Sequence, residues 1–103
     1  EGRANDAIRV KADPRIADMI PGFLRNRRQD VAAILDALDR GDFETVASLG
    51  HGMKGAGGSW GFQPITDIGA ALEIAAGRAD TDASRRCAGE LSGYLDRVEV
   101  VAG

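Results

Sequence analysis

The sequence predicts an all-α fold, an antiparallel up-down-up-down four-helix bundle with a short N-terminal lead-in helix. Three observations predict it. Apolar residues recur at helical spacing along most of the chain, strand-like alternation is absent, and aromatic residues make up only 5% of the sequence. The length of 103 residues suits one domain. We assign residues 1–12 to a polar lead-in segment and residues 13–103 to the bundle, whose short connections favour antiparallel neighbours.

A proline divides the predicted lead-in helix from the first long helix. Asp13 and Pro14 form a helix-start pattern, with aspartate as the cap and proline in the first turn. Pro21 ends or kinks this short helix. The first long helix then runs to about Arg40, and Gly41 stops it. Its predicted core stripe consists of Ile20, Leu24, Val31, Ile34, Leu35 and Leu38.

Three further amphipathic helices follow in the sequence. Asp42 is the expected cap of the second, over about residues 43–61, and Pro64 precedes the third, over about residues 65–77. The fourth is expected over about residues 82–101. The side chains predicted to face the core are Phe43, Val46, Leu49, Met53 and Trp60 in the second helix, Ile65, Ile68, Leu72 and Ala75 in the third, and Cys87, Leu91, Tyr94, Leu95 and Val98 in the fourth.

Composition and charge argue against several classes of function. The formal net charge of −3 lacks the basic surplus typical of nucleic-acid-binding domains. No apolar run approaches the roughly 20 residues that span a bilayer, so we expect no membrane insertion. The single cysteine, Cys87, cannot form an intradomain disulfide, which favours a reducing, cytoplasmic location. The sequence gives no sign of dimerisation, and we expect the domain to be monomeric.

The stretch from Gly50 to Gly61 contains six glycines, at positions 50, 52, 55, 57, 58 and 61. Each glycine inside a helix costs about 1 kcal/mol relative to alanine, so this stretch is either a flexible loop or a helix whose surface must stay bare. The apolar residues on both sides keep one helical phase across the glycines, which favours a helix. Gly50 and Gly57 then face inward, where Gly69 of the third helix is the expected partner for a close approach.

The one histidine, His51, is out of phase with the core stripe and is expected to point to the flank or to solvent. Lys54 follows at i+3, Gly55 at i+4 and Gly58 at i+7, so all three share its surface. A neutral imidazole is a competent nucleophile near neutral pH, and a lysine can place a point charge beside a phosphoryl group. A histidine and a lysine that are neighbours on a helix surface usually have no special function. The glycines around this pair are what favour a functional site.

The pattern around His51 is a histidine, any residue, an apolar residue, lysine, glycine, several small residues, and an aromatic residue before a further glycine. Over residues 51–62 the chain reads His-Gly-Met-Lys-Gly-Ala-Gly-Gly-Ser-Trp-Gly-Phe. This run resembles the histidine-containing phosphotransfer (HPt) family. The resemblance extends to Ile65, Gly69, Leu72 and Glu73, and upstream to the turn at residues 41–44, so that it covers most of residues 13–100.

The resemblance implies a four-helix bundle without catalytic activity of its own, which shuttles phosphoryl groups between aspartates of receiver domains. It implies that His51 is the phosphoacceptor, that Lys54 stabilises the phosphate, and that Gly55 and Gly58 give clearance for the partner. Glu73 matches a position near the histidine, where a carboxylate could orient the imidazole but would also repel phosphate; a solvated surface residue is the other interpretation. The domain itself is expected to bind no metal or cofactor, since the receiver supplies Mg²⁺.

Several alternatives stay open at the sequence level. The chain can exchange phosphate with a receiver domain, or His51 can be phosphorylated by a histidine kinase. A different class is an interaction module that docks receivers without accepting phosphate. An independent enzyme is the weakest option, because the sequence has no second titratable cluster, phosphate-binding loop or metal-ligand spacing. The basic residues Arg25, Arg27 and Arg28 could meet an acidic receiver, although ordinary surface charge explains them better.

Overall fold

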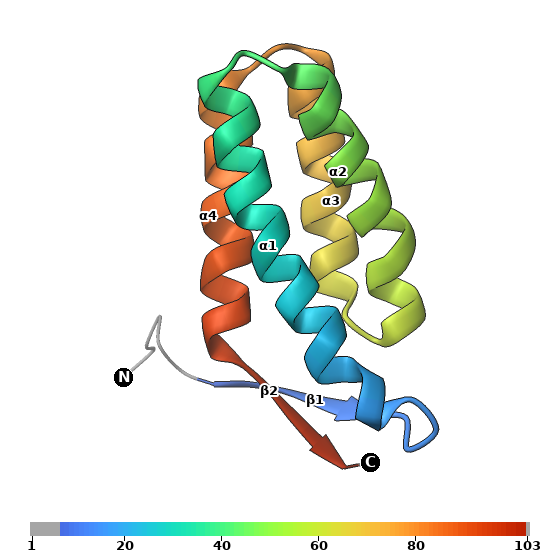
Figure 1. Cartoon of the computed structure of the whole chain (residues 1–103). Helices are drawn as coiled ribbons and strands as arrows, with labels where there is room; N and C mark the ends of the chain where they lie inside the picture. The colour runs from blue at the N-terminus through green and yellow to red at the C-terminus, as the bar shows by residue number, and fades with distance from the viewer. Residues whose placement is uncertain (1–6, 103) are drawn as a thin grey trace.

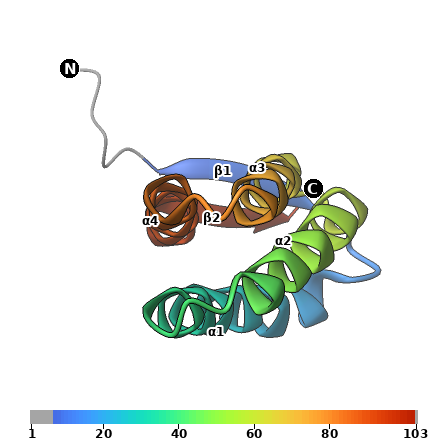
Figure 2. The ribbon, with the colours of Figure 1, turned by 90° about the horizontal axis from the view of Figure 1, so that it is seen from above.

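The computed structural model describes residues 7–102 and consists mainly of four helices packed side by side (Figure 1). Consecutive helices run in opposite directions, and the view along the bundle shows α1 beside α2 and α3 beside α4 (Figure 2). This arrangement confirms the predicted four-helix bundle. The bounds are α1 Ile20–Asp39, α2 Phe43–Gly57, α3 Gln63–Gly77 and α4 Thr81–Arg97, with one-turn 3₁₀ helices at Ala17–Met19 and Gly58–Trp60.

The predicted lead-in helix is wrong, because residues 14–16 form a turn and only one turn of 3₁₀ helix, Ala17–Met19, precedes α1. Upstream of this turn, the chain is extended and forms strand β1 (Ile8–Ala12). Asp13 does not cap a helix. Its carboxylate instead accepts hydrogen bonds from the Arg15 backbone N–H at 2.9 Å and from the Arg15 guanidinium at 2.7 Å, which closes a turn. Residues 1–6 of the lead-in segment lie outside the described residues.

A small parallel strand pair joins the two ends of the described chain, which the all-α prediction did not include. β1 pairs in parallel with β2 (Val98–Ala102), with Ile8 opposite Val98 and Ala12 opposite Ala102. The pair lies across one end of the bundle (Figure 1). Predicted to continue to residue 101, α4 instead ends at Arg97, because the β-branched residues of β2 favour an extended backbone.

The core follows the predicted stripes with a few exceptions. Leu35 is 41% exposed rather than buried, since it is one residue past the buried Ile34 and is therefore rotated about 100° around the helix. The prediction missed Phe23 and Phe62, which are buried. The Phe23 ring stacks on both Trp60 and Phe62, with ring centroids 4.8 and 5.6 Å away. These contacts pack α1 against the segment between α2 and α3.

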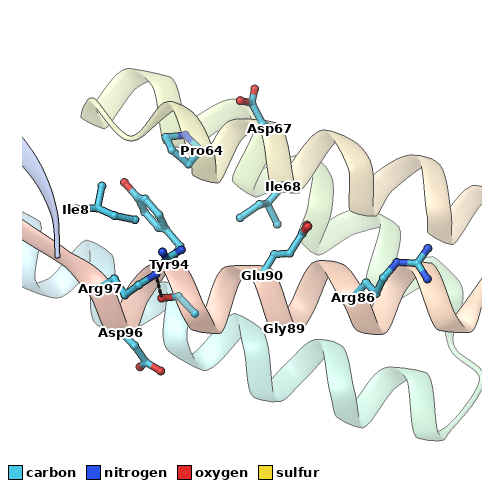
Figure 3. A pocket seen from close by; sticks show the side chains of 11 residues that line it. Ile8, Pro64, Asp67, Ile68, Arg86, Gly89, Glu90, Tyr94, Asp96 and Arg97 are labelled. Carbon is cyan, nitrogen blue, oxygen red and sulfur yellow. Dashed lines mark hydrogen bonds between the residues drawn. The ribbon is translucent and has the colours of Figure 1, made fainter. Parts of the chain in front are cut away.

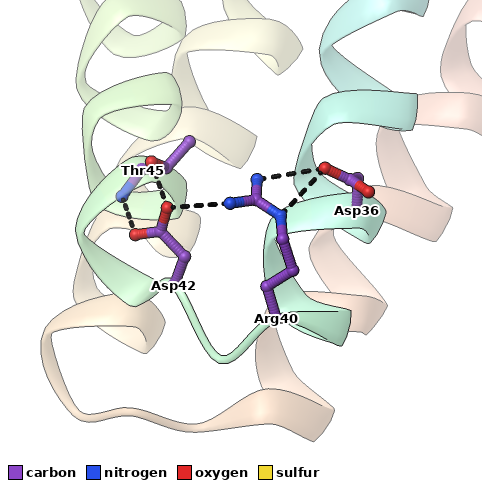
Figure 4. Close-up of polar contacts among 4 residues, drawn as sticks. All are labelled: Asp36, Arg40, Asp42 and Thr45. Atoms are coloured by element: carbon purple, nitrogen blue, oxygen red, sulfur yellow. Dashed lines mark hydrogen bonds and ion pairs between the residues drawn. The ribbon is translucent and has the colours of Figure 1, made fainter.

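A polar cluster fixes the turn that starts α2 (Figure 4). Asp42 caps the helix, accepting hydrogen bonds from the Thr45 N–H at 3.1 Å and the Thr45 hydroxyl at 2.7 Å, and these bonds lower the pKa of its carboxyl group. Arg40 bridges Asp36 and Asp42 at 3.0 and 3.5 Å. Gly41 supplies the positive φ of +68° that reverses the chain. The helix that carries His51 therefore begins at a defined residue.

Candidate functional site

Three inward-facing glycines allow α2 and α3 to lie almost backbone to backbone. A Cβ atom added at Gly69 would lie 2.5 Å from the Lys54 nitrogen and 2.6 Å from the Gly50 oxygen. One added at Gly57 would lie 2.5 Å from the Thr66 nitrogen. Since real Cβ atoms essentially never come this close to backbone, alanine does not fit without movement of a helix. The predicted close approach of Gly50 and Gly57 to the third helix, with Gly69 as partner, is confirmed.

The outward-facing glycines of α2 and of the 3₁₀ turn after it have a different environment. A Cβ at Gly52 or Gly55 would meet nothing within 4 Å, and one at Gly58 would make only ordinary contacts with Thr66 and Gln63. These positions do not need glycine for packing. The segment is nevertheless helical to Gly57, so the flexible-loop interpretation is wrong. The helix is four residues shorter than predicted, and Gly61, with φ +88°, closes the 3₁₀ turn after it.

Thr66 ties the end of α2 to α3, and sequence reasoning did not identify it. Its hydroxyl accepts a hydrogen bond from the Gly58 N–H at 2.7 Å and donates one to the Lys54 carbonyl at 3.1 Å. It thus satisfies two backbone groups near the helix end. Thr66 precedes Gly69 by three residues and shares its face, which is the one sequence signal for this role.

His51, Lys54 and Glu73 form one polar cluster across the α2–α3 interface. The His51 side chain is 74% exposed, as the sequence predicts, and its Nδ1 lies 3.1 Å from Glu73 Oε2. Lys54 Nζ lies 3.6 Å from the other carboxylate oxygen, Oε1. The close helix approach places Glu73 here, because its backbone nitrogen is one of the atoms that a Cβ at Gly50 would meet, at 2.8 Å.

The Glu73 contact determines which imidazole nitrogen is available. An ionised carboxylate only accepts hydrogen bonds, so Nδ1 must carry the proton in the His51–Glu73 bond. In the neutral ring the lone pair is then on Nε2.

Of the sequence-predicted site residues, the structure brings His51, Lys54 and Glu73 together and places Gly55 and Gly58 on the bare surface beside them.

The basic residues of α1 do not form an open basic patch. Arg27 pairs with Asp30 at 2.8 Å, and Arg28 pairs with Asp96 of α4 at 2.9 Å. Burial raises the pKa of Asp30, while Arg27 opposes the shift. Of the three arginines, Arg25 alone forms no ion pair within residues 7–102. These contacts favour the interpretation as ordinary surface charge.

Cys87 is buried in the core, and burial raises the pKa of its thiol. A buried thiol of this kind packs as a small apolar group and does not supply a thiolate nucleophile. His51, Lys54 and Glu73 are therefore the groups whose placement suggests chemistry.

The fold and the site together define a class of protein: a helical bundle that displays an exposed histidine, with a carboxylate and an amine beside it, on a surface where neighbouring positions are glycine. The family model of the Hpt domain matches residues 18–100, and the chain belongs to this family. Its members are histidine phosphotransfer modules of phosphorelays, which carry phosphoryl groups and interact with receiver domains and kinases. No curated protein and no solved structure matches the chain. None of the helices within residues 7–102 is long and apolar enough to cross a membrane.

Proposed function

We propose that His51 is the phosphoacceptor of this domain and that it carries a phosphoryl group between partner proteins. The observation that carries the proposal is the contact between His51 Nδ1 and Glu73, since a neutral ring that donates from Nδ1 has its lone pair on the exposed Nε2. An exposed imidazole with a free ring nitrogen needs no additional base to act as a nucleophile.

In the forward step, Nε2 of His51 attacks the phosphorus of an aspartyl phosphate on the partner. The N–P bond forms as the P–O bond to the aspartate breaks, and the electron pair of that bond returns to the aspartate carboxylate. The imidazole becomes cationic and keeps its Nδ1 proton, and the Glu73 carboxylate at 3.1 Å stabilises that charge. The reverse sequence returns the phosphoryl group to a second partner. The receiver domain supplies the Mg²⁺, and this domain binds no cofactor.

Lys54 stabilises the phosphoryl group once it has arrived. In the unphosphorylated protein its ammonium faces Glu73 at 3.6 Å, with about half of the Lys54 side chain exposed. An exposed ion pair of this kind contributes only about 0–1 kcal/mol, so Lys54 can leave it for the more highly charged phosphoryl oxygens at small cost. Lys54 belongs to the same helix as His51, one turn further along, which keeps its ammonium within reach of the ring.

The bare surface of α2 gives the partner access to the ring. Gly55 and Gly58 lie on the side of the helix that carries His51, and a Cβ at Gly55 would meet nothing within 4 Å. In-line phosphoryl transfer needs the two active groups within bonding approach of each other. Glycine at these positions removes the side chains that would keep a receiver active site at a distance.

The partners under this proposal are a receiver domain, a histidine kinase or both, in the cytoplasm, with no role for nucleic acid. One observation favours a second candidate, a module that docks receivers without accepting phosphate. The Glu73 carboxylate that orients His51 also places negative charge next to the position of the phosphoryl group.

Phosphoryl transfer from a panel of ³²P-labelled receiver domains, with wild type compared to His51→Gln, separates the two candidates. We expect acid-labile, base-stable label on the wild type and none on the variant, and the fastest donor identifies the partner. If no donor labels the wild type while the His51→Gln variant binds receivers equally well, the docking module is the correct function.

A further inference from the structure

The two sides of α3 have different surroundings. Toward α4, the helix borders a groove of about 1010 Å³, which Gly89 and Gly93 of α4 help to line (Figure 3). Toward α2, it presents Thr66, Gly69 and Glu73, whose spacings of three and four residues place them in one stripe along the helix. The side toward α2 is the one that bears on the proposed phosphoryl transfer, because all three residues of this stripe contact the helix that carries His51.

The stripe meets Lys54 at three points. A Cβ at Gly69 would lie 2.5 Å from the Lys54 backbone nitrogen, so the α3 backbone packs directly against that group. The Thr66 hydroxyl donates a hydrogen bond to the Lys54 carbonyl at 3.1 Å. Glu73 Oε1 lies 3.6 Å from the Lys54 ammonium. The backbone on both sides of the Lys54 Cα and the end of its side chain therefore all contact α3.

The Thr66 hydroxyl stands where a continuing helix would have a hydrogen bond of its own. In an α-helix the Gly58 N–H donates to the carbonyl four residues earlier, which is that of Lys54. Here the Gly58 N–H donates to the Thr66 hydroxyl at 2.7 Å, and the hydroxyl donates to the Lys54 carbonyl. A side chain inserted between the two groups in this way bends or ends a helix, and α2 ends at Gly57. A Cβ at Gly57 would lie 2.6 Å from the Thr66 hydroxyl oxygen, so glycine leaves the space for this insertion.

Lys54 has to change partners in the proposed reaction. Its ammonium faces Glu73 before transfer and the phosphoryl oxygens on His51 afterwards. A lysine side chain is long and flexible, so the direction of its backbone limits which positions the ammonium can reach. The hydrogen bond from Thr66 to the Lys54 carbonyl fixes that direction and leaves the ammonium free to move.

We propose that Thr66 is a positioning residue for phosphoryl transfer at His51. Its hydroxyl holds the last turn of α2, so that the Lys54 ammonium reaches the phosphoryl group on Nε2 of His51 once it leaves Glu73. This role rests on the function proposed for His51, and Thr66 acts in it through the Lys54 backbone. It concerns where the charge of Lys54 is held and not whether the imidazole reacts.

The lifetime of phosphorylated His51 tests this role. The full chain is labelled with potassium phosphoramidate, which transfers its phosphoryl group to an imidazole nitrogen and releases ammonia, and His51 is the only histidine in the sequence. Loss of the label at neutral pH is followed by ³¹P NMR. We expect Thr66→Val, which keeps the shape of the side chain and removes the hydroxyl, to shorten the lifetime about twofold to threefold, since an exposed contact between lysine and an anion is weak. Thr66→Ser retains a hydroxyl and is expected to keep the wild-type lifetime.

A double-mutant cycle with Lys54 separates positioning from a general loss of stability. In a Lys54→Gln background, Thr66→Val should leave the lifetime unchanged, because the charge that Thr66 positions is absent. Thr45→Val is the matched control at the other end of α2. It removes a threonine hydroxyl that donates to Asp42 at 2.7 Å, and the lifetime should stay that of the wild type.

The outcomes for Thr66 and for the carrier function are distinct. An unchanged lifetime in Thr66→Val, an equal shortening with and without the Lys54 charge, or a Thr66→Ser lifetime as short as that of Thr66→Val would each overturn the positioning role. The carrier function fails instead if no ³²P-labelled receiver domain labels the wild type. In that case the lifetimes of the chemically labelled protein still decide whether Thr66 positions Lys54.

Discussion

The two interfaces of α3 differ in what their glycines do. Toward α2, the glycines at 50, 57 and 69 face the neighbouring backbone, and an added Cβ would lie 2.5–2.8 Å from it. Toward α4, Gly89 and Gly93 face open space. The same residue type therefore brings two helices together on one side of α3 and leaves a groove on the other. The difference lies in the direction in which the missing side chain would point.

This contrast explains why the polar cluster lies at the α2–α3 interface. Backbone contact between α2 and α3 fixes their register, so Glu73 of α3 lies beside His51 of α2 with a defined distance of 3.1 Å. At Gly89 and Gly93, by contrast, α4 has no neighbouring backbone within 4 Å of an added Cβ. A site that depends on the spacing of two side chains needs an interface with backbone contact, such as the one between α2 and α3.

The largest effect is expected from Gly69→Ala, which places a methyl group 2.5 Å from the Lys54 backbone nitrogen. We expect a net loss of about 2 kcal/mol in the free energy of unfolding, because overpacking exceeds the gain in helix propensity of about 1 kcal/mol. Urea unfolding followed by circular dichroism measures it. Equal or greater stability in the variant would show that the helices can separate without cost, and that the close approach does not hold the site.

The helices and the histidine could be predicted from sequence because both are local. Apolar spacing of three and four residues locates each helix, and it also shows that His51 is out of phase with the core. Apolar spacing gave a wrong helix boundary where a strand happens to continue the same spacing. In α4 the phase that placed Val98 on the core stripe runs on into β2, and the helical reading was therefore extended too far.

The non-local features could not be derived in this way. The strand pair joins Ile8 to Val98, ninety positions apart, and five-residue segments carry too little pattern to reveal it. The position of Glu73 came only from the family resemblance, since its contact with His51 depends on the register of two helices. Thr66 was missed for the same reason: its hydrogen bonds to Gly58 and Lys54 follow from the register.

A smaller effect is expected from Glu73→Gln, which tests what the α2–α3 interface does for the histidine. The amide oxygen can still accept the Nδ1 hydrogen bond, but the negative charge near the phosphoryl group is gone. We expect phosphorylated His51 to lose its label roughly threefold to fivefold more slowly, since relief of one exposed like-charge contact is worth about 1 kcal/mol. The decay of ³²P label at neutral pH measures this rate.

Glu44→Gln is the matched control for that experiment, because it removes the same charge from the first turn of α2, away from the site. Imidazole ¹⁵N chemical shifts should show the Nδ1-protonated tautomer in the wild type and in Glu44→Gln. A Glu73→Gln variant with unchanged tautomer and unchanged label lifetime would assign Glu73 to the solvated surface. A changed tautomer with slower labelling would show that the carboxylate is needed to orient the ring.

The smallest effect is expected at the open interface, from Gly89→Ala. Nothing lies within 4 Å of the added methyl group, so only helix propensity changes, and we expect a gain of about 0.5–1 kcal/mol in the free energy of unfolding. The sign is opposite to that of Gly69→Ala although both replace a helical glycine of this bundle. Urea unfolding followed by circular dichroism measures the gain. A destabilised Gly89→Ala variant would show that α3 and α4 approach more closely at this position than the open space around Gly89 indicates, and the contrast between the two interfaces would then be lost.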